Sequence, residues 1–308
     1  MNTHVTDEYR PADSRVLAVM AFAQRNLPRG RGAVPRMLGK AVGRKPRFLV
    51  TRHGAHLALA SSAWDVYTTM ANHGGSWDYH DFEWCVNGIA NFGVFYDIGA
   101  NVGYFSIEMA MKLGDAVKVV AFEPQSDLAA AITKSAKLND MENVKVVQAM
   151  VGDTAQKTEL YLAPASIHAS AVADSGRPNV GTVETQMVTI DDLVEAAEIL
   201  PPDMVKIDVE GSEHLVLQGA YRTFRAHRPH IFLEYIAEFD RGDRVRRQVE
   251  KLLGDCLDLE LFGHENSKMS VRPYAWFRMR SEADWLRIDS LFLRNAQRPV
   301  RDRRVFEQ

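Results

Sequence analysis

Apolar positions follow two different patterns along the chain from Val94 onward. Short apolar runs that end at a glycine or an acid are typical of buried strands, and the stretches between them repeat apolar residues at helical spacing. The predicted strands are residues 94–99, 117–124, 144–153, 203–211, 230–235, 257–263 and 289–295, and the predicted helices are residues 104–113, 126–140, 191–199, 212–227 and 244–255. Strands that alternate with helices predict an α/β fold, with a mostly parallel sheet covered on both faces.

The segments before this pattern differ from it. Residues 1–46 are predicted to form a basic N-terminal arm with an amphipathic helix at Val16–Ala23, followed by a linker rich in Gly and Pro. An apolar run of eight residues before an Ala-x-Ala pattern is also typical of a secretory signal, but Asp7, Glu8 and Asp13 precede it and favour the helix. Residues 47–74 predict a β-hairpin extension that turns at Gly54, and residues 75–308 form the main domain.

Charge, cysteine content and the length of apolar runs limit the classes of protein to which this chain can belong. The 308 residues carry 37 Lys+Arg and 40 Asp+Glu, and this net charge of −3 gives no overall case for nucleic-acid binding. Charge is uneven, because residues 1–60 hold eleven Lys+Arg against three acids. Cys85 and Cys256 have no metal or redox spacing, so we expect no disulfide and a cytoplasmic protein. No apolar run is long enough to span a membrane.

Carboxylates end most of the predicted strands. In a parallel sheet of this kind, ligands bind beyond the carboxyl ends of the strands. The first strand runs into "DIGANVGYFS", which places Asp97 before Gly99 and Gly103. This spacing does not match the G-x-G-x-x-G turn of dinucleotide sites, and no Gly-Lys-Ser/Thr follows as in a phosphate loop. The acid also favours a ligand that carries positive charge over one that carries phosphate.

S-adenosylmethionine fits this pattern because it has an ammonium and a sulfonium but no phosphate. Asp97 is predicted to face the ammonium, while the two glycines let the backbone pass close to the ligand. Glu123 ends the second strand, where a carboxylate accepts hydrogen bonds from the ribose hydroxyls. Met150 and Val151, at the end of the third predicted strand, are expected to border the adenine. The remaining predicted cofactor contacts lie in the turn and at the start of the helix after it, at Ala100, Asn101 and Tyr104.

Five segments carry a resemblance to a known family. "DIGANVGYFS", "VVAFEP", "KLNDMENVKVVQAMVGD", "VTIDDL" and "VKIDVEGSE" resemble, in order and spacing, the FkbM family of S-adenosylmethionine-dependent methyltransferases. The resemblance implies a class I methyltransferase fold, a Rossmann-like three-layer sandwich with a seven-stranded sheet whose last strand is antiparallel. It also implies methyl transfer, usually to oxygen, with sugar or polyketide hydroxyls as acceptors. The basic arm and residues 264–288 lie outside the matching pattern.

Three residues after the fourth strand are candidates for catalysis. Methyl transfer to a hydroxyl gains from a nearby base that accepts its proton. Asp208 ends the strand and Glu210 follows on the same side of an extended chain. His214 lies four residues after Glu210, in the first turn of the next predicted helix, and is a third candidate because of its intrinsic pKa. A magnesium ion on Asp208 and nearby acids is conceivable, but none is predicted.

Other functions remain open at this point. An oxidoreductase that uses NAD could share this sheet, although the glycine spacing disfavours it. An RNA methyltransferase could use the basic arm, although no aromatic and basic stacking motif accompanies the arm. The predicted partner is a small-molecule or glycan acceptor and not DNA, with RNA disfavoured, and the arm could also contact an anionic membrane surface. The sequence does not indicate an oligomeric state.

Overall fold

The computed structural model describes most of the main domain and parts of the segment before it. The described residues are 10–11, 47–60, 62–63, 66–67, 70, 85–86, 89, 93–162, 181–235, 240, 242–256, 259–265 and 288–295. The predicted helix at Val16–Ala23, almost all of the arm and most of residues 264–288 lie outside them. The division of the chain at residues 46 and 74 therefore stays a prediction, as does a membrane contact of the arm.

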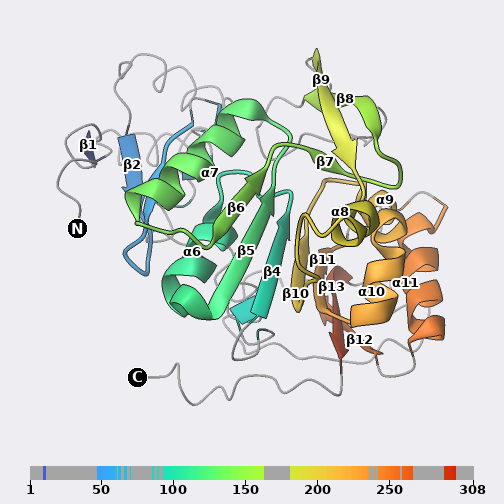
Figure 1. The fold of residues 1–308 in the computed structure, drawn as a ribbon. Coiled ribbons are helices and arrows are strands. Elements are labelled where there is room, and N and C mark those ends of the chain that lie inside the picture. The colour runs from blue at the N-terminus through green and yellow to red at the C-terminus, as the bar shows by residue number, and fades with distance from the viewer. Residues whose placement is uncertain are drawn as a thin grey trace.

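A seven-stranded sheet forms the centre of the molecule (Figure 1). Its order is β12-β13-β11-β10-β4-β5-β6, and only β13 runs against its neighbours. The strands are β4 (Gly93–Ile98), β5 (Val117–Phe122), β6 (Val144–Val147), β10 (Met204–Ile207), β11 (His230–Glu234), β12 (Leu259–Glu265) and β13 (Ile288–Asn295). From β4 the chain adds β5 and β6 on one side and β10 and β11 on the other, and β13 then inserts between β11 and the edge strand β12. This order and the antiparallel last strand confirm the predicted class I methyltransferase fold.

Helices cover both faces of the sheet (Figure 1). One face carries α6 (Tyr104–Leu113) and α7 (Ser126–Leu138), and the other carries α8 (Ile190–Glu195), α9 (Glu213–Gly219), α10 (Tyr221–His227) and α11 (Arg244–Asp255). A short 3-10 turn at Gly114–Ala116 leads from α6 into β5. Among the described helices, none is long and apolar enough to cross a membrane.

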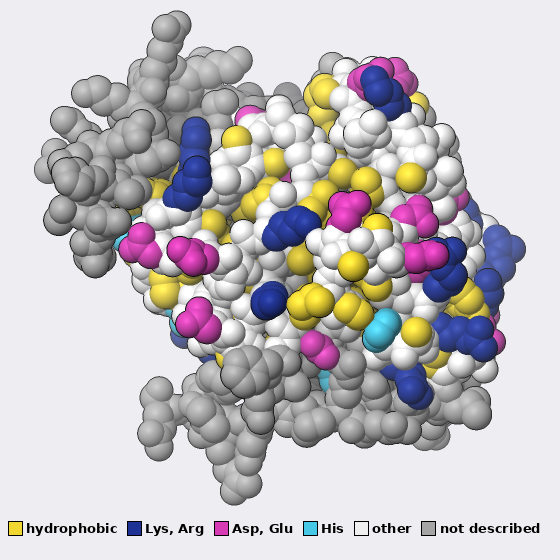
Figure 2. Space-filling view, in the orientation of Figure 1, with side chains coloured by type: hydrophobic (Ala, Val, Ile, Leu, Met, Phe, Trp, Pro, Cys, Tyr) yellow, Lys and Arg dark blue, Asp and Glu magenta, His cyan; other side chains and the backbone are white. Residues whose placement is uncertain are grey.

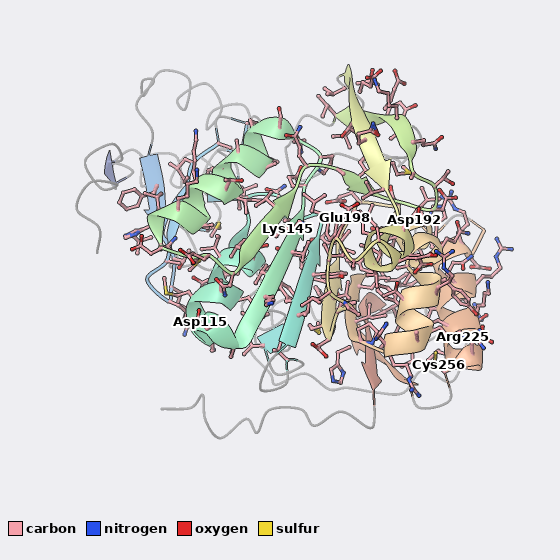
Figure 3. The ribbon with its side chains drawn as sticks, in the orientation of Figure 1. Asp115, Lys145, Asp192, Glu198, Arg225 and Cys256 are labelled. Carbon is pink, nitrogen blue, oxygen red and sulfur yellow. The ribbon has the colours of Figure 1, made fainter. Side chains whose placement is uncertain are left out.

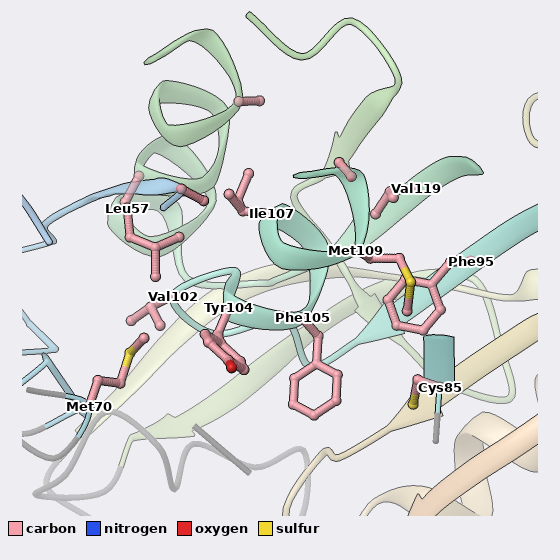
Figure 4. Packing of buried hydrophobic residues seen from close by; sticks show 14 of the residues in the cluster. Leu57, Met70, Cys85, Phe95, Val102, Tyr104, Phe105, Ile107, Met109 and Val119 are labelled. Carbon is pink, nitrogen blue, oxygen red and sulfur yellow. The ribbon is translucent and has the colours of Figure 1, made fainter. Parts of the chain in front are cut away.

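The side chains of β4 alternate between the two faces of the sheet, so this strand contributes to both hydrophobic clusters. Phe95 packs in the cluster below α6 and α7, whereas Val94, Tyr96 and Ile98 pack in the cluster below α9 to α11. Successive side chains of a strand point to opposite faces, so one fully buried strand serves two cores. Figure 4 shows the first cluster, in which Phe95 lies among side chains of the helix α6.

The hairpin predicted near Gly54 is present and packs on this first core. Strands β2 (Arg47–Val50) and β3 (His56–Ala58) pair antiparallel, and β1 (Arg10–Pro11) pairs parallel with β2. Glu108 of α6 is fully buried and accepts hydrogen bonds from Thr51 and His53 in the hairpin loop. Ser135 of α7 accepts a hydrogen bond from the backbone N–H of Ala58, 2.9 Å away. The hairpin is thus fixed to both helices of one face.

Two sequence predictions of elements are wrong in detail. The predicted third strand is split: β6 ends at Val147, and Met150–Val151 form β7 in a separate sheet with β8 (Gln156–Leu162) and β9 (Gly181–Val188). The predicted helix at 212–227 is also split, into α9 and α10. At the last residue of α9, Gly219, a Cβ would lie 1.8 Å from the Gly152 carbonyl oxygen, so glycine lets this end of the helix approach the chain just after β7.

Side-chain contacts tie the outer elements together (Figure 3). Lys145 of β6 donates to the carbonyl oxygen of Glu198 beyond α8, at 2.8 Å. Cys256, after α11, lies 3.8 Å from the carbonyl oxygen of Arg225 in α10. Both Cys85 and Cys256 are buried, and neither forms a disulfide within the part of the chain that the structure describes.

Candidate functional site

Four neighbouring parallel strands end at one edge of the sheet. In the registers of β5, β4, β10 and β11, Phe122 pairs with Ile98, Ile98 with Ile207, and Ile207 with Leu233. The acids that the sequence singled out lie at or just beyond these four ends: Asp97, Glu123, Asp208, Glu210 and Glu234. The structure therefore gathers them along one edge.

Asp97 is buried beneath the first turn. It is 1% exposed, and its Oδ2 accepts hydrogen bonds from the N–H of Ser106 at 3.1 Å and from the Ser106 hydroxyl at 2.6 Å. Burial raises the pKa of Asp97, while Lys206 and Ser106 act in the opposite direction. Oδ1 lies 3.7 Å from Lys206 Nζ and accepts no hydrogen bond from the described part of the chain. A buried carboxylate oxygen left in this state fits a ligand that brings a cationic donor.

Glu123 holds the turn beside it. Its Oε2 accepts from the backbone N–H of Asn101 and its Oε1 from that of Gln125, both at 2.9 Å. Asn101, whose N–H makes the first of these bonds, adopts a left-handed conformation with φ 52°. Burial raises the pKa of Glu123 to about 8. Each oxygen of a carboxylate has two lone pairs, so both retain one with which to accept a ribose hydroxyl.

The two glycines have packing roles of their own. Gly99 has φ +79°, and a Cβ there would lie 2.0 Å from the carbonyl oxygen of Asp208. Gly103 has the same φ, and its Cβ would lie 2.8 Å from Cγ1 of Ile132 in α7. From the sequence, both glycines were predicted to let the backbone pass close to the ligand. The structure shows what each makes room for within the protein, and their contact with a ligand stays a prediction.

The other predicted cofactor contacts lie in two places. Ala100 packs with Ala121 and Ile132 beneath the turn, and Tyr104 is buried in the first core cluster beside Phe105 (Figure 4). Met150 and Val151 are buried too, but in β7. Their placement at the end of the third strand of the main sheet was therefore wrong, because the chain leaves that sheet after Val147. Their contact with the adenine stays a prediction.

A buried lysine, which was not among the residues predicted from the sequence, lies between Asp97 at the end of β4 and Asp208 after β10. Lys206 is 5% exposed, and its Nζ lies 3.0 Å from Asp208 Oδ2 and 3.7 Å from Asp97 Oδ1. The ammonium also lies 5.1 Å from the centre of the Phe105 ring. Burial alone would lower the pKa of Lys206, but Asp208 and Asp97 outweigh burial and raise it. The sequence did contain a signal for this residue: a lysine inside the apolar strand "MVKI" is rarely buried unless its charge is paired.

Three carboxylates converge at the ends of β10 and β11. Oxygens of Asp208, Glu210 and Glu234 all lie within 4.8 Å of one another. Burial, and then the negative charges of Asp208 and Glu210, raise the pKa of Glu234 to about 10. Glu234 also shares a hydrogen bond with Asp208, which favours its protonated form. Such a group, here named the acid cluster, can hold and accept a proton, and carboxylates so placed can also bind a cation.

His214, the third catalytic candidate, lies beside the acid cluster rather than in it. It is the second residue of α9, and it lines a small cavity together with Glu234 and the start of α11. Burial, and then the charge of Arg244, lower its pKa. The sequence analysis did not identify Tyr235, Asp240 or Arg244, which also line this cavity.

Comparison with known proteins places the chain in a family. The FkbM methyltransferase domain matches residues 97–269, more than half of the 308 residues, and the chain belongs to this family. The family was suggested by the sequence, and the match confirms it. It supports the methyltransferase interpretation over the oxidoreductase.

Two curated relatives and one solved structure are similar to the chain. Hexuronic acid methyltransferase AglP of Haloferax volcanii is 29% identical over 126 residues, which cover 41% of this chain and 49% of AglP. Methyltransferase sdnD of Sordaria araneosa is 25% identical over 190 residues, covering 52% and 71% of the two chains. The chain thus spans about half the length of AglP. Methyltransferase FkbM from Methylobacillus flagellatus KT superposes with a TM-score of 0.44 at 15% identity, covering 75% of this chain and 54% of that one.

Proposed function

We propose that the protein is an S-adenosylmethionine-dependent methyltransferase that methylates a hydroxyl of a sugar, a glycan or another small acceptor. The observation that carries this proposal is the shared strand edge. Asp97 and Glu123 lie at one part of it, and the acid cluster of Asp208, Glu210 and Glu234 lies at the other. Family membership supports methyl transfer, and AglP, a hexuronic acid methyltransferase by name, supports a sugar acceptor.

The residues at β4 and β5 would hold the methyl donor. The free Oδ1 of Asp97 accepts from its ammonium, and Glu123 accepts from its ribose hydroxyls. The donor, when bound, supplies an activated methyl group on a sulfonium. The chain contributes chiefly by fixing the hydroxyl close to that methyl group, because most of the acceleration of an in-line displacement comes from positioning.

The acid cluster would take the proton of the hydroxyl. Glu234 lies against two further carboxylates and so is a strong base once it has lost its own proton. Asp208 accepts from the Lys206 ammonium, which favours a role in holding the cluster together. Glu210 has a left-handed φ of 56°, which directs the chain from β10 into α9. The base is therefore expected among these residues, with Glu234 added to the candidates from the sequence.

A binding and transfer experiment tests the proposal. Calorimetric titration with S-adenosylhomocysteine should show binding, and titration with NAD should show none. Release of methyl label from S-adenosylmethionine onto sugar acceptors should then fall in Asp208→Asn and Glu210→Gln variants that still bind S-adenosylhomocysteine. Binding of NAD alone would contradict the proposal. Full transfer rates in both variants would remove both residues from the role of base.

A further inference from the structure

A small cavity adjoins the acid cluster on the side of α9 and α11. Residues from the start of α9, the end of β11 and the start of α11 line it: Gly211, Glu213, His214, Glu234, Tyr235, Asp240, Arg244 and Val245. Glu234 belongs both to this cavity and to the acid cluster. A ligand in the cavity would therefore reach the place where the proposed reaction occurs.

Two polar groups in the cavity lack partners in the described chain. The His214 side chain is buried, with the residue 6% exposed, and its Nδ1 makes no hydrogen bond with the described residues. Arg244 is half-buried, and its guanidinium forms no ion pair or hydrogen bond with any part of the chain that the structure describes. Leaving a buried polar atom such as His214 Nδ1 unsatisfied is unfavourable, so this atom points to a ligand that completes it, and the guanidinium of Arg244 is available to the same ligand.

The acids of the cavity are already engaged. Asp240 accepts from the backbone N–H groups of Val245 at 2.9 Å and Arg246 at 3.2 Å, and it also shares a hydrogen bond with Tyr235. Glu213 accepts from the N–H of Gly211 at 2.9 Å. The groups left to bind a ligand are thus a guanidinium, an imidazole and the carboxyl of Glu234.

These three groups select a ligand with two different ends. The planar fork of a guanidinium matches the two oxygens of a carboxylate, and this pairing is among the strongest in proteins. A neutral imidazole has one N–H that can donate to one of the same oxygens. Glu234 faces the acid cluster, where a hydroxyl is to lose its proton. One molecule that carries both a carboxylate and hydroxyl groups satisfies all three.

We propose that this cavity binds the carboxylate of the methyl acceptor through Arg244 and His214, which makes the acceptor a hydroxy acid of the uronic acid class. The inference rests on the proposed function and deepens it by naming the substrate class. A carboxylate held here leaves the hydroxyls of the same molecule directed toward Glu234, so Arg244 would determine both the choice of acceptor and its orientation.

The test compares two sugars that differ in one group. Saturation-transfer NMR on the protein with S-adenosylhomocysteine measures binding of methyl glucuronide and of methyl glucoside, which lacks the carboxylate. We expect methyl glucuronide to bind at least about tenfold more tightly, as a charge-assisted pair predicts. Arg244→Gln should remove this preference, and His214→Gln should reduce it. Arg247→Gln is the matched control, because Arg247 lies on the same helix but is exposed.

The outcomes separate this inference from the proposed function. If S-adenosylhomocysteine does not bind the unaltered protein, the proposed function fails. If it binds, but the two glycosides bind equally or methyl glucuronide does not bind, the cavity is not a carboxylate site. The same conclusion follows if Arg244→Gln keeps its S-adenosylhomocysteine affinity and its circular dichroism spectrum and still prefers methyl glucuronide.

Discussion

The ends of β4 and β5 differ from the ends of β10 and β11 in how their acids are held. Asp97 and Glu123 accept hydrogen bonds from the turns and the helix start that follow β4 and β5: the N–H and hydroxyl of Ser106, and the N–H groups of Asn101 and Gln125. Asp208, Glu210 and Glu234 instead face one another from two strands, and a lysine supplies the nearest positive charge.

This difference favours ligand binding as the role of Asp97 and Glu123, and proton transfer as the role of the acid cluster. Acids fixed by N–H groups have a defined geometry whether or not a ligand is present. Acids that face each other share a proton, because two carboxylates in contact do not both ionise readily. The first part can recognise a ligand, and the second can exchange a proton with one.

Glu234→Gln should have the largest effect. The change keeps the size of the side chain but removes its capacity as a base, and we expect the rate of methyl transfer to fall by about 10²–10⁴. Affinity for S-adenosylhomocysteine, measured by calorimetry, should stay the same because Asp97 and Glu123 are intact. Glu198→Gln, an exposed acid after α8, is the control. An unchanged rate in Glu234→Gln would show that Glu234 is not the base.

Asp97→Ala combined with Glu123→Ala should strongly weaken the binding of S-adenosylhomocysteine, which Glu234→Gln should leave unchanged. Loss of two charge-assisted contacts is expected to weaken S-adenosylhomocysteine binding by about a hundredfold or more. Asp115→Ala provides the control, since Asp115 is exposed at the opposite end of β5 (Figure 3). Circular dichroism must show a folded double variant. A folded double variant that binds as tightly as the unaltered protein would mean that the donor lies elsewhere.

The rate of methyl transfer should depend on pH through Glu234. A base acts only when it has lost its proton, and burial together with Asp208 and Glu210 raises the pKa of Glu234 to about 10. The rate should therefore rise with pH, by up to about tenfold per unit, until the pH reaches about 10. Glu234→Gln should abolish this rise. A flat profile in the unaltered protein would assign the base to another group.

Gly99→Ala should lower the stability of the protein, because Gly99 lies where the chain after β4 contacts the chain after β10. A Cβ at this position would lie 2.0 Å from the Asp208 carbonyl oxygen, and φ is +79°. We expect the free energy of unfolding to fall by at least about 2 kcal/mol. Gly114→Ala has a positive φ of +54° but open space around it, and should cost about 1 kcal/mol. Urea unfolding measures both, and equal losses would show that backbone strain alone matters at Gly99.

A chelator should have the smallest effect. Lys206 Nζ already lies 3.0 Å from Asp208 Oδ2, so a cation is present at the acid cluster without a metal ion. We expect EDTA to leave the rate of methyl transfer unchanged. A loss of activity that magnesium restores would show instead that the acid cluster binds a metal ion.

The sequence was sufficient for the fold because its signals are local. Buried apolar runs, helical spacing and the hairpin turn at Gly54 each depend on a few neighbouring residues, and all have counterparts in the structure. The errors arise where distant segments meet. Gly219, where α9 ends, lies against Gly152, which is distant in the sequence, and β7 pairs with β9 instead of continuing the main sheet. Neither contact has a signature in the local pattern.

The same distinction applies to the site. Asp97, Glu123 and Asp208 could be proposed because each follows an apolar run at a strand end. The ion pair of Lys206 with Asp97 could not be predicted, since Asp97 lies on the neighbouring strand β4. The cavity at His214 was missed for the same reason, because α11 reaches the end of β11 only in the folded chain. The roles of all these residues stay predictions until they are tested.

The hairpin β2–β3 has a practical consequence for anyone who wishes to shorten this protein. The family match begins at Asp97, inside β4, whereas Leu49 and Leu57 of the hairpin belong to the core below α6 and α7. Burial of one such side chain contributes about 1.5–3 kcal/mol. A version that starts at the family boundary would lack most of a central strand and expose an apolar surface that promotes aggregation. Expression trials should therefore begin before Arg47.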